Sequence, residues 1–329
     1  MKRTKNPAKE AEYRKRAADL VAQMTLHEKV SQMLSWAPAI ERLGIPAYNW
    51  WSEGIHGVGR AGTATVFPQA IGMAAAFDED MMEQVGNAIG VEARGKYNMC
   101  RAHGDRDIFK GLTVWAPNIN IFRDPRWGRG HETYGEDPFL TSRLGVRFVE
   151  GMQGDDPDYL QAAACAKHFA VHSGPESDRH HFNAIVSKQD LWETYLPAFR
   201  ALVKEAGVEA VMGAYNRTNG EPCCGSKTLL KDILRDKWHF DGHVTSDCWA
   251  IKDFHTGHMV TDGPVESVAL AVNNGCDLNC GSAFLHLQEA YEKGLVSEEA
   301  ITEAVERLME VRIRLGMMKD YPSPCLLYT

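Results

Sequence analysis

An aspartate and a tryptophan, Asp247 and Trp249, follow an apolar, β-branched stretch that begins at Gly242 and stops abruptly. A carboxylate at such a strand end can attack the anomeric carbon of a sugar, and an indole face can pack on the sugar's C–H surface. The pair therefore indicates glycosidic-bond chemistry, with Asp247 as the candidate nucleophile. The alternative is a strand-terminal aspartate that caps the following helix.

Lys167 and His168 form a second polar pair, directly after the predicted strand 162–166. Neighbouring donors at a strand end suit the vicinal hydroxyls of a sugar. The alternative is that Lys167 extends along apolar surface and His168 caps a backbone carbonyl.

Two further segments carry candidate site residues. Residues 48–57 contain two tryptophans followed by Glu53, which suits a pocket wall with an acceptor for sugar hydroxyls, although two adjacent tryptophans also suit core packing. Residues 118–138 interleave three arginines with four acids, and most of these charges are expected to form structural ion pairs. One guanidinium is left to clamp hydroxyls or to help hold the nucleophile's charge.

The elements that must position these residues follow an alternating pattern. Short apolar runs are predicted as buried strands, at 112–116, 162–166, 208–214, 243–246 and 275–278. Amphipathic helices between such runs favour a parallel sheet covered on both faces. Each run ends in polar or aromatic residues, which would ring one pocket in a (β/α)8 barrel. A doubly wound sheet is the alternative, but no glycine-rich phosphate loop is present.

Helix boundaries are also readable. Thr25 and Glu28 have the spacing of a capping box, Ser187 and Asp190 repeat it, and Ser297 is predicted to start another helix. We therefore predict a helical lead-in over 1–24, a single (β/α)8 TIM-like catalytic barrel over 25–320, and a truncated or non-native tail over 321–329.

Composition restricts the function classes. The chain of 329 residues has a net charge of −8, which argues against nucleic acid or an anionic membrane as partner and suits a neutral substrate. No signal peptide or membrane span is predicted, so a cytoplasmic location is expected. The eight cysteines are then expected to be thiols. No histidine or cysteine spacing fits a metal site, and no cofactor is expected. The oligomeric state stays open, a homo-oligomer of the full-length protein included.

Five segments resemble, in order, the signature segments of family 3 glycoside hydrolases, the β-glucosidases and β-xylosidases. They are WWSEGIHG, DPRWGRGHETYGEDP, KHFAVHSGPESDRHHFNA, MGAYNRTNG and VTSDCWA. The resemblance implies a retaining double displacement on terminal β-D-glucosyl or β-D-xylosyl residues of a short oligosaccharide or an aryl glycoside, with Asp247 forming the covalent intermediate. It implies sugar contacts at Glu53, Arg129, Lys167, His168 and Tyr215, and further contacts at Trp115, Arg179 and Trp249.

The resemblance also implies that the acid/base is a glutamate from a following domain that this chain lacks. An alternative is Asp178 with His180, which keeps the D-x-H spacing of the dyad in the family's single-domain N-acetylglucosaminidases. An imidazole held by a carboxylate is a competent proton donor near neutral pH. A third hypothesis is a sugar-binding module without catalysis.

Overall fold

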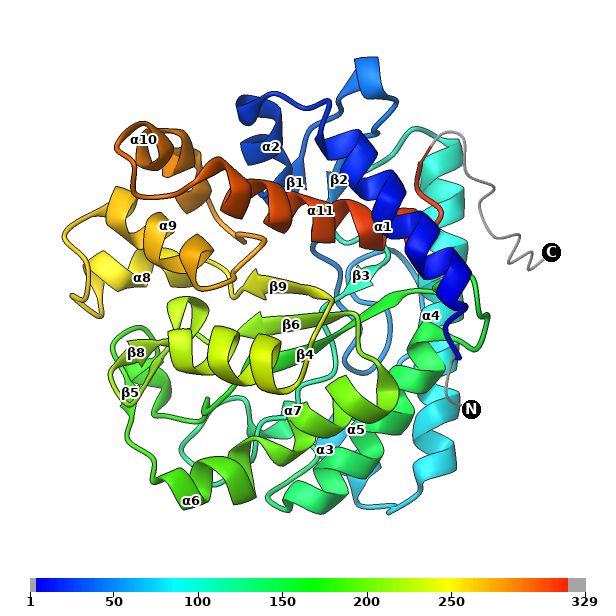
Figure 1. Ribbon diagram of the computed structural model, residues 1–329. Helices are drawn as coiled ribbons and strands as arrows, with labels where there is room; N and C mark the ends of the chain where they lie inside the picture. Colours follow the sequence, from blue (N-terminus) through cyan, green and yellow to red (C-terminus); the bar gives the residue numbers. More distant parts are fainter. Residues whose placement is uncertain (1–3, 319–329) are drawn as a thin grey trace.

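A parallel sheet forms the centre of the molecule in the computed structural model, which describes residues 4–318 (Figure 1). Its strands are β3 (Thr113–Val114), β4 (Ala163–Phe169), β6 (Ala210–Gly213) and β9 (His243–Ser246), in the order β3-β4-β6-β9. All neighbouring pairs are parallel. Every residue of these strands is buried, as expected for a sheet with helices on both faces.

Isolated parallel bridges continue the sheet at both edges. They join Thr245 to Leu278, Leu34 to Asn279 and Ser52 to Val114. A separate antiparallel pair joins β1 (Trp36–Ala37) to β2 (Tyr48–Asn49). The parallel α/β core is therefore confirmed, whereas the part of the chain that the structure describes has four strands in its parallel sheet rather than eight.

The predicted strand 275–278 joins the sheet only through the bridge at Leu278. The reason is local, because the side chain of Asp277 replaces a backbone acceptor. Its Oδ2 accepts from the Val244 amide at 2.7 Å and from Arg235 at 2.8 Å. A regular ladder would use a carbonyl at this place.

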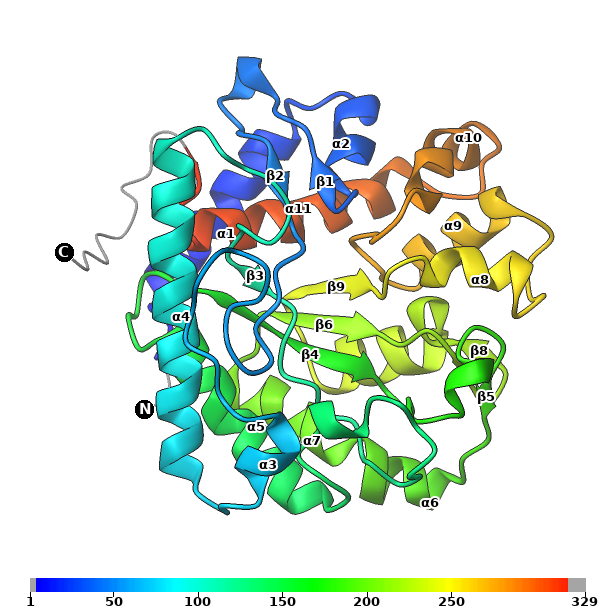
Figure 2. The same cartoon turned by 180° about the vertical axis from the view of Figure 1, so that it is seen from behind.

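Helices enclose the sheet (Figures 1 and 2). The longest are α4 (Glu79–Ala102), α5 (Pro138–Gln153) and α11 (Glu298–Arg314). Glycines let α4 and α5 approach closely, because a Cβ at Gly86 would collide with the Phe148 carbonyl oxygen and a Cβ at Gly151 with that of Glu83. The remaining α-helices of four residues or more are α1 (Pro7–Val21), α2 (Leu26–Gln32), α3 (Ala70–Ala74), α7 (Pro197–Ala201), α8 (Ala250–Thr256), α9 (Pro264–Asn273) and α10 (Leu287–Glu292), and a wider π-type helix spans Lys227–Lys237.

The first and last of these helices are locked together by buried charges. Arg314 at the end of α11 pairs with Glu10 of α1 at 2.8 Å and with Glu209, and it also contacts Glu310. Removing one partner from such a buried network is strongly destabilising as a rule. The lead-in helix is therefore packed into the domain.

The predicted helix starts are confirmed at Thr25, where the reciprocal capping box with Glu28 forms, and at Ser297, whose side chain caps α11. Ser187 caps α6 (Lys188–Asp190), and the helical segment continues to Ala206, where Gly207 is left-handed at φ 63°. A wide π-type turn over Leu191–Tyr195 interrupts it. Pro197 explains the irregularity, because it has no N–H to donate.

The predicted tail, residues 321–329, lies outside the described residues. Across residues 4–318, no helix has the length and apolarity needed to cross a bilayer.

Candidate active site

Asp247 lies directly after β9, at the edge of the sheet where the parallel strands end. Its backbone amide donates to the Gly213 carbonyl at 3.2 Å. Lys167 and His168 lie within β4, Trp115 follows β3, and Tyr215 lies two residues beyond β6. The parallel arrangement brings these residues, far apart in sequence, to one edge.

The Asp247 carboxylate is buried and asymmetrically bound. Its Oδ1 accepts from the Cys248 amide at 2.8 Å, while Oδ2 has no hydrogen-bond partner among the described residues. Burial raises the pKa of Asp247, and the positive charges of Arg129 and Lys167 oppose that shift. One carboxylate oxygen is thus held by the backbone and the other remains available.

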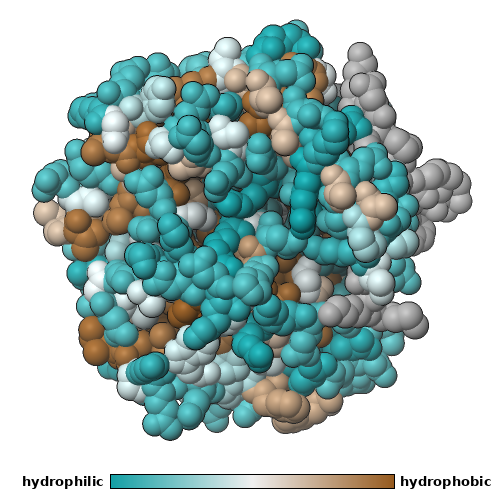
Figure 3. All heavy atoms as spheres, in the orientation of Figure 1, coloured by the Kyte–Doolittle hydropathy of each residue, from teal (hydrophilic) through white to brown (hydrophobic). Residues whose placement is uncertain are grey.

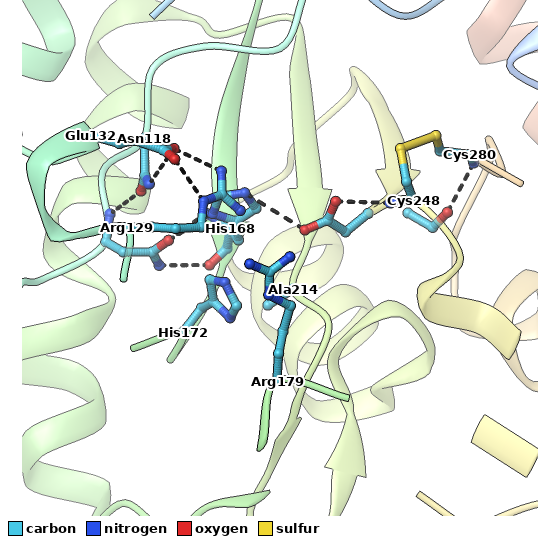
Figure 4. Close-up of polar contacts among 12 residues, drawn as sticks. Asn118, Arg129, Glu132, His168, His172, Arg179, Ala214, Cys248 and Cys280 are labelled. Atoms are coloured by element: carbon cyan, nitrogen blue, oxygen red, sulfur yellow. Dashed lines mark hydrogen bonds and ion pairs between the residues drawn. A yellow bond between two sulfur atoms is a disulfide. The ribbon is translucent and has the colours of Figure 1, made fainter. Parts of the chain in front are cut away.

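His168 faces that available oxygen, with Nε2 3.7 Å from Asp247 Oδ2 (Figure 4). Asn120 fixes the tautomer: its Nδ2 donates to the His168 and Ala170 carbonyls, so its Oδ1 must accept from His168 Nδ1 at 3.0 Å. Burial and the nearby Arg129 hold the pKa of His168 well below its usual value. The ring is therefore neutral, and Nε2 presents a lone pair to a ligand.

Arg129 is clamped by Glu132 in a two-pronged pair, with N–O distances of 2.8 and 2.7 Å. Burial opposes ionisation of Glu132, but the hydrogen bonds and charge of Arg129 prevail and lower its pKa to about 2. Arg126 pairs with Asp124 in the same loop, as the predicted ion pairing requires. Glu132 thus occupies Nε and Nη2 of Arg129, and the charge of the guanidinium still acts on Asp247.

Tyr215 lies between two basic side chains. The Arg179 guanidinium lies 5.5 Å from its ring centroid, and the His180 ring packs edge-on at 5.0 Å. Burial, followed by the charge of Asp247, raises the pKa of Tyr215, so its hydroxyl stays protonated. Figure 4 shows Arg179 extending toward the region of His168 and His172.

The two adjacent tryptophans have different roles. Trp50 is fully buried against Tyr48 and His243, so it belongs to the core. Trp51 is half-buried, stacks on Trp115 with ring centroids 5.5 Å apart, and donates from Nε1 to Glu53 Oε1 at 2.7 Å. Core packing is therefore confirmed for Trp50, whereas a pocket wall formed by Trp51 and Glu53 stays a prediction.

Trp249 is largely exposed, at 53%. It adopts a left-handed conformation, φ 68°, and its amide donates to the Cys280 carbonyl at 2.7 Å. It lines a cavity of about 260 Å³ together with Lys252, His255 and His286. Figure 3 shows hydrophobic residues at the surface near α8 and α9, where Met259 and Leu285 are also exposed.

Comparison with known proteins identifies the family. The glycosyl hydrolase family 3 N-terminal domain matches residues 16–311. The chain belongs to glycosyl hydrolase family 3. It is 49% identical over 313 residues to a xylan 1,4-β-xylosidase of Xylanibacter ruminicola and 44% identical over 330 residues to a probable β-D-xylosidase of Arabidopsis thaliana. These alignments cover 93% and 94% of this chain but 36% and 42% of the relatives, so the family 3 chain spans about two-fifths of their length.

Solved family 3 structures share the fold. A family 3 exo-β-xylosidase in complex with a xylobiose aziridine activity-based probe aligns with a TM-score of 0.87 at 34% identity, over 95% of this chain and 42% of that chain. A β-glucosidase from Listeria innocua in complex with isofagomine aligns with a TM-score of 0.80 at 29% identity, over 96% of this chain and 48% of the other.

The cysteines of this family 3 chain correct one expectation. Cys248 and Cys280 form a disulfide, so the prediction that all eight cysteines are thiols was wrong. They are 32 residues apart in sequence, but the bridge between Thr245 and Leu278 brings the two segments together. The free cysteines of the described residues are Cys100, Cys165, Cys223, Cys224 and Cys276.

The predicted pairing of Asp178 with His180 needs a second correction. Nδ1 of His180 lies 2.7 Å from Oδ2 of Asp253 in α8, whereas the carboxylate of Asp178 lies 4.0 Å from His181. Asp178 is the last residue of the turn Glu176–Asp178, and its charge partner is His181 rather than His180. The family 3 chain therefore has an imidazole–carboxylate pair, with a different acid.

Sequence reasoning missed the polar residues behind the site. Asn120 holds His168, and Asn216 Oδ1 accepts from His172 Nδ1 at 2.9 Å. Asn216 lies two residues beyond the predicted strand 208–214, and this position is the signal that marks it, whereas Asn120 lies four residues beyond the predicted strand 112–116. Asp253 gave no such signal, because its partner lies 73 residues away.

Proposed function

We propose that this chain is the nucleophile-bearing domain of a retaining β-glycosidase. The observation that carries the proposal is the Asp247 carboxylate, buried at the strand edge with Oδ2 unpartnered among the described residues. A buried carboxylate near cationic side chains stays ionised yet reactive. The segments joined to the sheet by isolated parallel bridges support a (β/α)8-like arrangement of the strands. A cytoplasmic location stays a prediction.

The reaction proceeds in two displacements. Asp247 Oδ2 forms a bond to C1 while the bond from C1 to the leaving oxygen breaks, and that oxygen receives a proton. Water then attacks C1 with loss of a proton, and the carboxylate of Asp247 is released. Each step inverts the anomeric centre, so the β configuration is retained.

The neighbouring side chains orient the sugar. His168 accepts a hydrogen bond from a sugar hydroxyl at Nε2, Lys167 and Arg129 donate to ring hydroxyls, and Glu53 accepts from them. Tyr215 donates its hydroxyl close to the nucleophile. The walls of the proposed sugar pocket also include Trp115, Arg179 and Trp249, with Trp249 on the side of the leaving group.

A terminal β-D-xylosyl residue is the proposed substrate, with β-D-glucosyl as the second candidate. The support is the naming of the relatives, since those at 49% and 44% identity are described as xylosidases and the Listeria glucosidase is 29% identical. Short β-linked oligosaccharides and aryl xylosides are the substrates to test.

The proton for the leaving oxygen is proposed to come from a carboxyl group outside residues 4–318. Glu132 is a poor candidate, because with a pKa of about 2 it is ionised at neutral pH. His180 held by Asp253 is the alternative donor, favoured by their 2.7 Å contact.

The test is a 2-deoxy-2-fluoro-β-xyloside with an activated leaving group, which needs no acid catalyst for the first step. Intact mass followed by peptide mapping should locate one added sugar on Asp247. Asp247→Asn should abolish the adduct, and the matched change Asp253→Asn should not. Binding of xylose without any adduct would instead support a non-catalytic sugar-binding module.

A further inference from the structure

A disulfide and three backbone contacts surround the turn that carries Asp247. The Cys248 amide donates to Asp247 Oδ1 at 2.8 Å, and the Trp249 amide donates to the Cys280 carbonyl at 2.7 Å. The Cys280 amide donates to Ser246 Oγ at 3.0 Å. The bond between Cys248 and Cys280 joins the two halves of this arrangement covalently (Figure 4).

The arrangement lies where the regular strand pairing ends, and a last hydrogen bond from the Asp247 amide to the Gly213 carbonyl, at 3.2 Å, follows that pairing. The parallel pairing of β9 ends at Ser246, and the bridge from Thr245 to Leu278 stops two residues before Cys280. Beyond these points the disulfide is the covalent link between the two segments. Trp249, the residue after Cys248, is already 53% exposed.

The orientation of the carboxylate depends on the same turn. With no partner at Oδ2 among the described residues, Asp247 is oriented through Oδ1 and therefore through the amide of Cys248. The backbone of Cys248 sets the direction of its amide. The disulfide to Cys280 and the hydrogen bond from the Trp249 amide to the Cys280 carbonyl restrain that backbone.

We propose that the Cys248–Cys280 disulfide is a positioning element for the Asp247 carboxylate, so that its reduction slows transfer of a sugar to that oxygen. This inference rests on the proposed function. Reduction by dithiothreitol breaks the S–S bond and forms two S–H bonds, while the reductant loses two electrons and two protons and closes to its cyclic disulfide. The protein gains the mass of two hydrogen atoms, which intact mass reports.

The experiment compares the oxidised chain, the reduced chain and the variant Cys248→Ser/Cys280→Ser. The rate of labelling by the fluoroxyloside is measured for each over a range of concentrations. Deuterium exchange at the amides of Cys248, Trp249 and Cys280 is measured in parallel, because it does not require catalysis. Cys100→Ser is the matched control, since it removes a half-buried free thiol and keeps the disulfide.

We expect the maximal labelling rate to fall on the order of tenfold to a hundredfold upon reduction, to recover on reoxidation, and to be insensitive to reductant in the double variant. Exchange at the three amides should rise, while circular dichroism shows that the fold persists. An unchanged labelling rate or unchanged exchange in the reduced, folded chain overturns the positioning role. If the oxidised chain gives no adduct but exchange rises on reduction, the proposed function fails and the restraint of the turn stands.

Discussion

His180 and Asp253 are hydrogen-bonded across 73 residues of sequence, with Nδ1 2.7 Å from Oδ2, and the His180 ring rests edge-on against Tyr215. The pair therefore supports the wall of the site from behind Tyr215. Such an edge-to-face contact is worth about 0.5–1.5 kcal/mol beyond buried area.

His180→Ala is expected to weaken sugar binding about two- to tenfold while the labelling of Asp247 by an activated xyloside persists. Asp178→Ala should leave both unchanged, because Asp178 does not contact His180. Titration calorimetry with xylose and labelling rates measure the two effects. Turnover of an unactivated substrate that has a histidine-like pH limb, lost in His180→Ala, would instead make His180 the acid.

Asn120→Ala is expected to lower both stability and sugar affinity. The variant frees the His168 ring to change tautomer and leaves two buried carbonyls without their donor, which costs about 1–3 kcal/mol. Urea unfolding measures the first effect and calorimetry the second. If xylose affinity is unaltered in a folded variant, the tautomer of His168 does not matter for binding.

The Arg129–Glu132 pair predicts acid sensitivity. The pKa of Glu132 is lowered from 4.5 to about 2, so the stability that this group contributes is present above pH 4.5 and is lost as the pH falls toward 2. The full shift corresponds to about 3 kcal/mol. Urea unfolding of Glu132→Gln and the unchanged chain should therefore differ most near pH 6, and the difference should shrink as the pH falls from 4.5 through about 2. A constant difference across that range would contradict the ion pair.

The disulfide should also stabilise the domain. In the loop-closure description, a bridge across 32 residues contributes about 4 kcal/mol, so Cys248→Ala/Cys280→Ala should unfold at clearly lower urea concentration. A loss below about 1 kcal/mol would mean that the unfolded chain gains little freedom on losing the bridge.

Close packing of α4 on α5 predicts opposite effects for two glycines of one helix. Gly86→Ala drives a methyl into the Phe148 carbonyl and should destabilise by about 1–3 kcal/mol or more. Gly95→Ala, in the same helix with no atom within 4 Å of the new methyl, should stabilise by up to about 1 kcal/mol. Thermal unfolding of the two variants provides the comparison.

Local patterns predicted what local chemistry controls. The capping box at Thr25 and the strand 243–246 ending before Asp247 were correct, because each depends on residues close in sequence. The predicted strands 112–116, 162–166 and 208–214 each overlap a strand of the sheet, but β4 continues to Phe169, so that Lys167 and His168 lie within it rather than after it.

Contacts between segments distant in the sequence could not be predicted from local patterns. The disulfide depends on how the segment near Leu278 lies beside β9, and the partner of His180 depends on where α8 begins. The antiparallel pairing of β1 with β2 had no alternating pattern to reveal it, because each strand has two residues.

The direction of α11 has a consequence for any sequence that continues beyond it. Figure 1 shows α11 running opposite to the strands, from the end of the domain where their arrowheads point to the opposite end. With 17 residues this helix is about 25 Å long. A downstream module that donates a proton above Asp247 would need a return linker of at least about eight extended residues. With a shorter linker the proton donor could not reach the leaving oxygen, so attack by Asp247 would lose its acid catalyst.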